Sequence, residues 1–173
     1  MSTLKWKLFG IAIAFPVTVA AAGPNLGQPL SHADLAAWDI NVLPDGSGLP
    51  KGSGTAAQGA TIYAQKCAAC HGEQGKGGIS AALVGAPPMK DMSSPKTIAN
   101  FWPYSTTLFD FIRRAMPFTQ PRSLSDEEVY ALTAYILAQN KLIGEKDEMN
   151  AQTLPKVKMP NRDGFIPRFP ERM

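Results

Sequence analysis

Two cysteines and a histidine, set close together, constrain this chain more than any other feature. They read Cys67-Ala68-Ala69-Cys70-His71, and the 173 residues contain no further cysteine. A fold stapled by several disulfides is therefore excluded. The apolar share of 45% is too high for a disordered chain, while 15 glycines and 15 prolines indicate much turn and loop. The length suits one domain with extensions at its ends.

The C-x-x-C-H spacing is the attachment signature for c-type haem. Two thiols at this separation, at the end of a helix, reach both vinyl groups along one edge of a porphyrin. The histidine that follows then lies under the iron and coordinates it through a ring nitrogen. We therefore predict one covalent haem c, attached through Cys67 and Cys70 and ligated by His71. Three alternatives explain less. A redox dithiol expects a βαβ context, a structural zinc site needs four ligands, and a plain structural disulfide would not need His71.

The sixth iron ligand has to come from the opposite face of the haem. Met116 is the best candidate, because it ends an amphipathic helix and is held by Pro117, so that a thioether is presented from a fixed place. Methionine–histidine ligation raises the reduction potential, as an electron carrier in an oxidising pathway requires. The alternative role of any methionine is to fill the core. The other candidate ligands are Met89, Met92, Met159 and His32.

Three further side chains are candidates for contacts with the haem propionates, namely Trp102, Tyr104 and Arg113. Buried tryptophan and tyrosine side chains seek polar partners. Arg113 and Arg114 project about 100° apart on a helix, so at most one of them faces the haem. The alternatives are core packing for the two aromatic residues and solvated surface for the arginines.

Residues 1–22 have the three-part layout of a secretory signal peptide, with a basic start, an apolar stretch over 8–19 and small residues up to Ala22. We expect cleavage after Ala22 and a periplasmic mature protein. A retained anchor is the alternative, although Pro16 interrupts the apolar stretch, which is short for a membrane span. Loss of the two lysines in this segment lowers the net charge from +3 to +1, which gives no indication of a nucleic-acid partner.

The rest of the chain divides into an N-terminal arm (23–54), a helical domain (55–140) and a Pro-rich C-terminal arm (141–173). The arms either lie along a partner subunit or cover the surface of the domain itself. No alternating strand pattern of convincing length occurs, so the domain is expected to be mostly α. Helices are expected at 32–38, 55–66, 107–115 and 125–140.

Capping residues support these four helices. Ser31 with Asp34, and Thr107 with Asp110, have the spacing of a capping pair. Thr55 can cap the second helix, and acidic residues fill the first turn after Ser125. In the third helix the expected buried stripe consists of Leu108, Phe111, Ile112 and Ala115.

The segment from about 55 to 140 resembles a class I cytochrome c, a fold of three to five helices around one haem. In that family the first and last helices cross at a glycine and an aromatic residue, which match Gly59 and Tyr63. Leu132 and Tyr135 match their counterparts on the last helix. The family also implies a proline carbonyl that accepts a hydrogen bond from the proximal histidine, but Ala81 stands at that position in this chain.

Four longer runs of residues indicate a closer resemblance, to one group of cytochromes. The runs AWDI at 37–40, PDGSGLP at 44–50, NFWPYSTTLFD at 100–110 and RRAMPF at 113–118 are similar to the cytochrome subunit of the bacterial Sox sulfane dehydrogenase and to cytochromes paired with sulfite-dehydrogenase-type molybdenum enzymes. This resemblance spans about 27–140. Many members of that group carry a second haem domain, whereas this chain has one haem motif.

These observations leave three candidate functions for the chain. The resemblance implies an electron-accepting subunit, without catalytic residues of its own, of a molybdenum-dependent sulfane or sulfite dehydrogenase that passes electrons to a downstream cytochrome c or oxidase. The second is a free-standing periplasmic shuttle that serves an oxidase or another dehydrogenase. The third, an enzyme or gas sensor with an open sixth position, requires that Met116 does not bind iron.

Overall fold

The computed structural model describes residues 26–36 and 38–166, which fall into two units. The predicted signal peptide lies outside the described residues, as does most of the chain before the first helix. In the N-terminal unit, α1 (His32–Ala36) is capped by Ser31, whose backbone N–H donates to Asp34 Oδ2 at 3.0 Å, as predicted. The helix ends at Ala36 and leaves Trp38 outside it, and none of its residues is buried.

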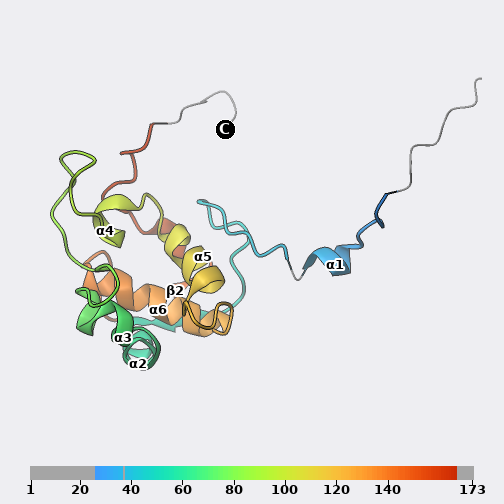
Figure 1. Cartoon of the computed structure of the whole chain (residues 1–173), viewed down its shortest axis with the longest axis horizontal. Helices are drawn as coiled ribbons and strands as arrows, with labels where there is room; N and C mark the ends of the chain where they lie inside the picture. Colours follow the sequence, from blue (N-terminus) through green and yellow to red (C-terminus); the bar gives the residue numbers. More distant parts are fainter. Residues whose placement is uncertain (1–25, 37, 167–173) are drawn as a thin grey trace, which may run out of the picture. The chain divides into compact units, whose positions relative to one another are not determined.

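The second unit, 38–166, is mostly helical, as predicted (Figure 1). Its long helices are α2 (Ala56–Lys66), α5 (Ser105–Ala115) and α6 (Asp126–Gln139). The short helical segments are α3 (Ala68–His71), η1 (Glu73–Gly75), α4 (Ile98–Phe101) and η2 (Leu154–Lys156). No helix among the described residues is both long and apolar enough to cross a bilayer.

Helix α6 is the centre of this unit and packs against both α2 and α5. Its start follows the predicted signal, because the Ser125 side chain accepts from the Glu128 N–H and the Glu128 carboxylate accepts from the Ser125 N–H. Thr55 caps α2 in the same reciprocal way with Gln58. Every residue of α6 from Val129 to Leu137 is buried, so this helix lies within the core.

The α2–α6 crossing depends on a residue without a side chain. A Cβ on Gly59 would overlap the backbone carbonyl of Ala131 and crowd the Tyr135 Cβ. Next to this contact, the rings of Tyr63 and Tyr135 lie 5.0 Å apart between centroids. The crossing therefore uses the glycine and the aromatic pair that the family resemblance predicted.

The third long helix differs from its prediction. It begins at Ser105, two residues early, with Tyr104 at the N-cap, so Thr107 does not cap it. Asp110 instead binds Arg114, with 2.8 Å between Arg114 Nε and Asp110 Oδ2. The start is set by a tertiary contact, because the Ser105 hydroxyl donates to the Leu154 carbonyl at 2.6 Å.

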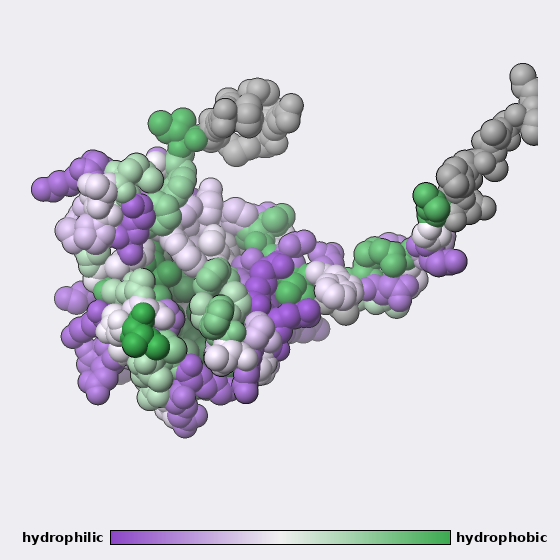
Figure 2. Space-filling view, viewed as in Figure 1, coloured by the Kyte–Doolittle hydropathy of each residue, from purple (hydrophilic) through white to green (hydrophobic). Residues whose placement is uncertain are grey.

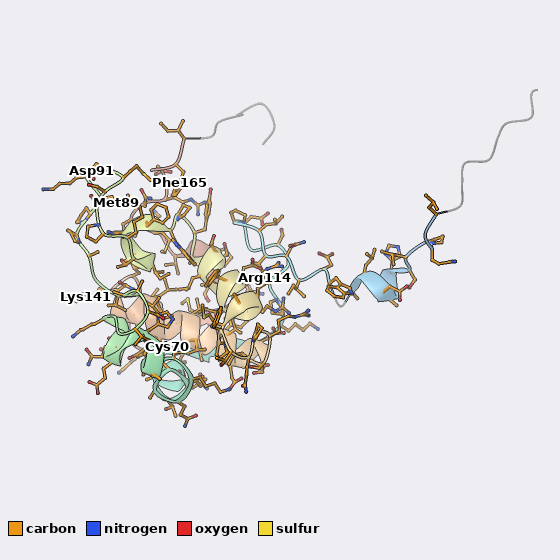
Figure 3. All side chains as sticks on the ribbon, viewed as in Figure 1. Cys70, Met89, Asp91, Arg114, Lys141 and Phe165 are labelled. Atoms are coloured by element: carbon orange, nitrogen blue, oxygen red, sulfur yellow. The ribbon has the colours of Figure 1, made fainter. Side chains whose placement is uncertain are left out.

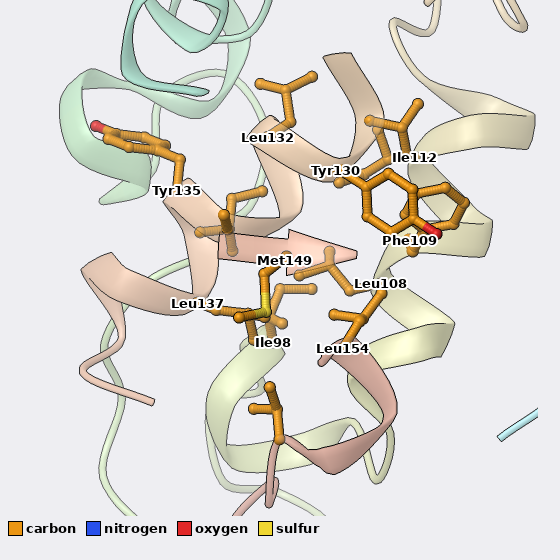
Figure 4. Close-up of a cluster of buried hydrophobic side chains, with 14 of the residues drawn as sticks. Ile98, Leu108, Phe109, Ile112, Tyr130, Leu132, Tyr135, Leu137, Met149 and Leu154 are labelled. Atoms are coloured by element: carbon orange, nitrogen blue, oxygen red, sulfur yellow. The ribbon is translucent and has the colours of Figure 1, made fainter. Parts of the chain in front are cut away.

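The buried face of α5 also differs from its prediction. Leu108 and Ile112 are buried as predicted, but Phe109 is fully buried in place of Phe111, which is 44% exposed. Ala115 is half-buried. Phe109 packs against Tyr130 of α6 with 4.4 Å between ring centroids, and Figure 4 shows these rings meeting between the two helices.

A small sheet was not predicted. Strand β1 (Ser53–Thr55) pairs antiparallel with β2 (Glu148–Asn150), with Gly54 opposite Met149. Three-residue strands are too short to leave a readable alternation in the sequence. The pairing brings the chain after α6 back onto the domain, and Figure 4 shows Met149 and Leu154 among the core side chains.

Candidate haem site

The two cysteines and the histidine lie on one short stretch of helix. Cys67 ends α2, where its N–H donates to the Tyr63 carbonyl at 2.9 Å, and His71 ends α3, which follows at once. Cys67 is half-buried and Cys70 is exposed. Burial raises the pKa of the Cys67 thiol to about 11. A redox dithiol needs a lowered pKa, so this environment argues against that alternative.

A backbone carbonyl orients the His71 ring. His71 Nδ1 lies 3.1 Å from the carbonyl oxygen of Ala81, which leaves Nε2 as the ring nitrogen that is free to bind a metal. The contact is the one that a proline provides in the family, so alanine at this position retains it. The loop that carries Ala81 turns sharply at Gly72, where φ is 75° and a Cβ would overlap the Gly77 carbonyl.

Asn140, which sequence reasoning missed, fastens this loop to the end of α6. Its side-chain Nδ2 donates to the Leu83 carbonyl at 3.1 Å, and its Oδ1 accepts from the Gly85 N–H at 3.1 Å. One amide thus binds the loop twice. An asparagine directly after a helix is the only signal in the sequence, and it is typical of any helix C-terminus.

Met116 lies on the wall of the same cavity as His71. It is the C-cap of α5, where its N–H donates to the Ile112 carbonyl at 3.1 Å. Met116 and His71 both line a cavity of about 360 Å³ and a smaller, adjoining one of about 90 Å³. The sequence therefore identified the histidine and the methionine that the fold brings to one cavity.

The other candidate ligands lie elsewhere. Met89 and Met92 line a separate groove beside Phe165, and Figure 3 shows Met89 and Phe165 at one end of the domain and Cys70 at another. Met159 is buried in the core and lines neither cavity. His32 belongs to the N-terminal unit.

The walls of the larger cavity are mainly apolar. Figure 2 shows apolar atoms gathered around a hollow on this face of the domain. Besides the two cysteines, the histidine and the methionine, the cavity is lined by apolar residues from α5, α6 and the glycine-rich loop, among them Ile79, Leu83, Ile112, Leu132 and Ile136. The cavity is thus apolar and is lined by two thiols, an imidazole and a thioether. This combination suits a covalently attached haem.

Of the three residues predicted to contact the propionates, the fold brings only Trp102 to this site. Trp102 lines the smaller cavity and packs edge-on against Phe111, 5.5 Å between centroids. Tyr104 lies under the Arg162 guanidinium, 4.3 Å from its ring centroid. Arg113 forms an ion pair with Asp126, with 3.0 Å between Nε and Oδ1. Neither Tyr104 nor Arg113 lines either cavity.

The fold and the site together define a c-type cytochrome. Comparison with known proteins leads to the same class, since residues 54–136 match the family described as cytochrome c oxidase, cbb3-type, subunit III. A crystal structure of the sulfane dehydrogenase SoxCD from Paracoccus pantotrophus is similar over 86% of this chain and 74% of its own, with 36% identity and a TM-score of 0.78. The chain belongs to the c-type cytochromes, and membership of this family implies haem c.

Two curated proteins are each similar to about half of this chain. A thiosulfate dehydrogenase from Stutzerimonas stutzeri (strain A1501) is 33% identical over 87 residues, which are 50% of this chain and 28% of that protein. The cbb3-type cytochrome c oxidase subunit CcoP from Azospirillum sp. (strain B510) is 30% identical over 98 residues, 52% of this chain and 30% of that protein. The chain thus spans less than a third of the length of either relative.

Proposed function

We propose that this chain is a periplasmic, single-haem cytochrome that accepts electrons one at a time from a molybdenum-dependent sulfane or sulfite dehydrogenase, as a subunit of that enzyme. One observation carries the proposal. The likeness to the SoxCD structure covers 86% of the chain, whereas the general cytochrome match covers only residues 54–136. The likeness therefore includes chain on both sides of the haem-binding core, which a generic cytochrome would not need to share.

The chain's own residues set up the site for this role. Cys67 and Cys70 would hold the haem through two thioether links, and His71 and Met116, which line the same cavity, would bind its iron. The bound haem supplies a one-electron change at its iron. The Ala81 carbonyl holds the His71 ring in one orientation. The apolar walls exclude water and disfavour the more highly charged oxidised form, and the Met116 thioether shifts the potential in the same direction.

Export and the division of the chain are part of the proposal. The signal peptide over 1–22, with cleavage after Ala22, delivers the protein to the periplasm, where its haem is attached. Residues 55–140 hold the haem, and the segments 23–54 and 141–173 flank this domain. The direct electron donor is the molybdenum subunit, and the acceptor is a downstream cytochrome c or oxidase.

The test is purification from the native periplasm under mild salt, with a reduced-minus-oxidised spectrum taken before and after addition of sulfite or a sulfur-loaded carrier protein. Co-elution with a molybdenum subunit and rapid haem reduction by one of these donors support the proposal. A lone low-spin cytochrome that neither donor reduces overturns it in favour of the free-standing shuttle.

The assignment of Met116 has its own test. Met116→Ala is expected to convert the haem from low-spin to high-spin and to lower its potential, because the iron loses its thioether ligand. Met92→Ala is the matched control, since Met92 is 72% exposed and lines a different groove. An unchanged low-spin spectrum in Met116→Ala places the sixth ligand on another residue.

A further inference from the structure

Large apolar side chains are exposed along the start of the described chain. Leu26 is 87% exposed, Leu30 68% and Trp38 76%, and Leu35 on α1 is also exposed. We call residues 26–36 together with Trp38 the apolar segment. Figure 2 shows apolar atoms recurring along this segment. Exposed apolar residues gathered in one segment, rather than scattered singly, are typical of a binding surface.

The chain that follows the apolar segment is fixed to the haem domain. Arg114 Nη2 donates to Asn41 Oδ1 at 2.9 Å, and the Tyr130 hydroxyl donates to the Pro50 carbonyl at 2.9 Å. Arg114 is itself held by Asp110. The chain that directly follows the apolar segment is thus fixed to the haem domain at Asn41 and Pro50.

The charge of this region favours a protein partner over a membrane. No lysine or arginine occurs between Lys7 and Lys51, whereas Asp34, Asp39 and Asp45 do occur in this stretch. A segment that binds a membrane surface carries lysine and arginine on its polar face, because bilayer surfaces are anionic. An apolar segment with acidic residues instead complements an apolar groove with a basic margin.

The likeness to the SoxCD structure also extends into this region. A match over 86% of 173 residues needs about 149 residues, and residues 38–173 provide only 136. Part of the match therefore lies before residue 38. The general cytochrome match, by contrast, begins only at residue 54. Part of the chain before residue 38 is therefore similar to the SoxCD structure, although it lies outside the residues that match the general cytochrome family.

We propose that the apolar segment is the anchor by which this cytochrome holds its dehydrogenase, with Leu30, Leu35 and Trp38 inserted into an apolar groove of the molybdenum subunit and Asp39 facing a basic residue at the groove's margin. The inference rests on the proposed function. Tryptophan at the centre of such a contact carries a large share of binding. The haem domain then needs only a weak contact of its own for electrons to pass.

The test compares two variants of the full-length, haem-loaded cytochrome for binding to the purified molybdenum subunit. The first variant combines Leu30→Ser, Leu35→Ser and Trp38→Ser. The control combines Met92→Ser and Ile166→Ser, which remove apolar side chains that are 72% and 93% exposed outside the apolar segment. We expect the first variant to bind at least tenfold more weakly than wild type, and the control to bind within twofold of it. All three proteins should show the same haem spectrum.

A charge variant refines the test. Asp39→Lys is expected to slow association with the molybdenum subunit several-fold at low salt, and the difference from wild type should shrink as salt rises, since rim charges act mainly on association rates. An unchanged association rate at low salt would contradict a basic margin to the groove.

The other outcomes are distinguishable. If wild type does not bind the molybdenum subunit, the proposed function fails and the anchor fails with it. If wild type and the triple variant bind it equally, only the anchor is overturned. A wild-type dimer that becomes monomeric in the triple variant, with dehydrogenase binding unchanged, assigns the segment to a second copy of this chain. Wild-type binding to phosphatidylglycerol vesicles that the triple variant loses, again with dehydrogenase binding unchanged, assigns the segment to a membrane.

Discussion

The two ends of the described chain look alike in sequence but differ in burial. Both are interrupted by proline and glycine and contain little regular structure. The apolar segment exposes its large side chains, and its backbone and side-chain hydrogen bonds within the described chain join residues at most four positions apart. The segment 148–159 instead buries Met149, Leu154, Val157 and Met159 in the core.

The difference shows that interruption by proline and glycine predicts irregular backbone and says nothing about burial. In 148–159 the chain pairs with β1 and then presents apolar residues toward α5. Polar contacts fix this position, because Ser105 donates to the Leu154 carbonyl and Asn161 Nδ2 donates to the Phe101 carbonyl at 2.6 Å. The described hydrogen bonds of the apolar segment join residues close in sequence, and its leucines and its tryptophan are exposed.

The largest effect expected from this comparison is on the core. Leu154→Ala should lower the free energy of unfolding by about 3 kcal/mol, because it leaves a cavity where a fully buried side chain was. Leu30→Ala, the same substitution in the apolar segment, should change it by less than about 0.5 kcal/mol. Urea denaturation of the haem-loaded proteins measures both values. Equal effects of the two substitutions would contradict the difference in burial.

A smaller effect is expected at the polar contact that holds the C-terminal segment in place. Ser105→Ala removes one donor to the Leu154 carbonyl, which still accepts a hydrogen bond from the Val157 N–H at 3.2 Å. The expected loss is about 1 kcal/mol, the net contribution of one hydrogen bond. Ser31→Ala removes a comparable hydroxyl from the N-terminal unit and should leave global unfolding unchanged, since α1 buries no residue. The same denaturation curves test both, and a Ser105→Ala protein as stable as wild type would show that the contact is dispensable.

The smallest effect concerns two similar helix caps. Hydrogen bonds from Lys66 and from the Ser125 N–H lower the pKa of Glu128 below its ordinary value of 4.5. Its carboxylate therefore stabilises the fold above pH 4.5, and this contribution is lost as the pH falls through the lower, folded-state pKa. Glu128→Gln should cost about 0.5 kcal/mol at pH 7, mainly through the ion pair with Lys66.

The pH dependence provides the check. The stability difference between wild type and Glu128→Gln should close as the pH falls below 4.5. Asp34, whose pKa is lowered by hydrogen bonds from Ser31, forms the equivalent cap on α1. Asp34→Asn should leave global unfolding unchanged at every pH, because α1 buries no residue. A difference between wild type and Glu128→Gln that does not narrow as the pH falls below 4.5 would point to a role other than the charge of this carboxylate.

Local sequence signals predicted what depends on local chemistry. The Cys67–His71 motif marked the site, and the caps at Thr55 and Ser125 marked the starts of α2 and α6, because each signal is complete within a few residues. The start of α5 was missed because Ser105 is held by Leu154, 49 positions away. The pairing of Tyr104 with Arg162 and the double contact of Asn140 were missed for the same reason.

The Asn140 contact has a consequence for how fast electrons move. A change of charge at the iron is slowed by every nearby atom that must shift to accommodate it, and a fixed surrounding keeps that rearrangement small. Asn140 fastens the loop that carries Ala81 to α6, and α6 packs against α2, which leads directly into the helix of His71. The His71 imidazole is therefore held by a closed chain of contacts through Ala81, Asn140, α6 and α2. In the haem site that we propose, this support would keep the geometry nearly the same in both oxidation states.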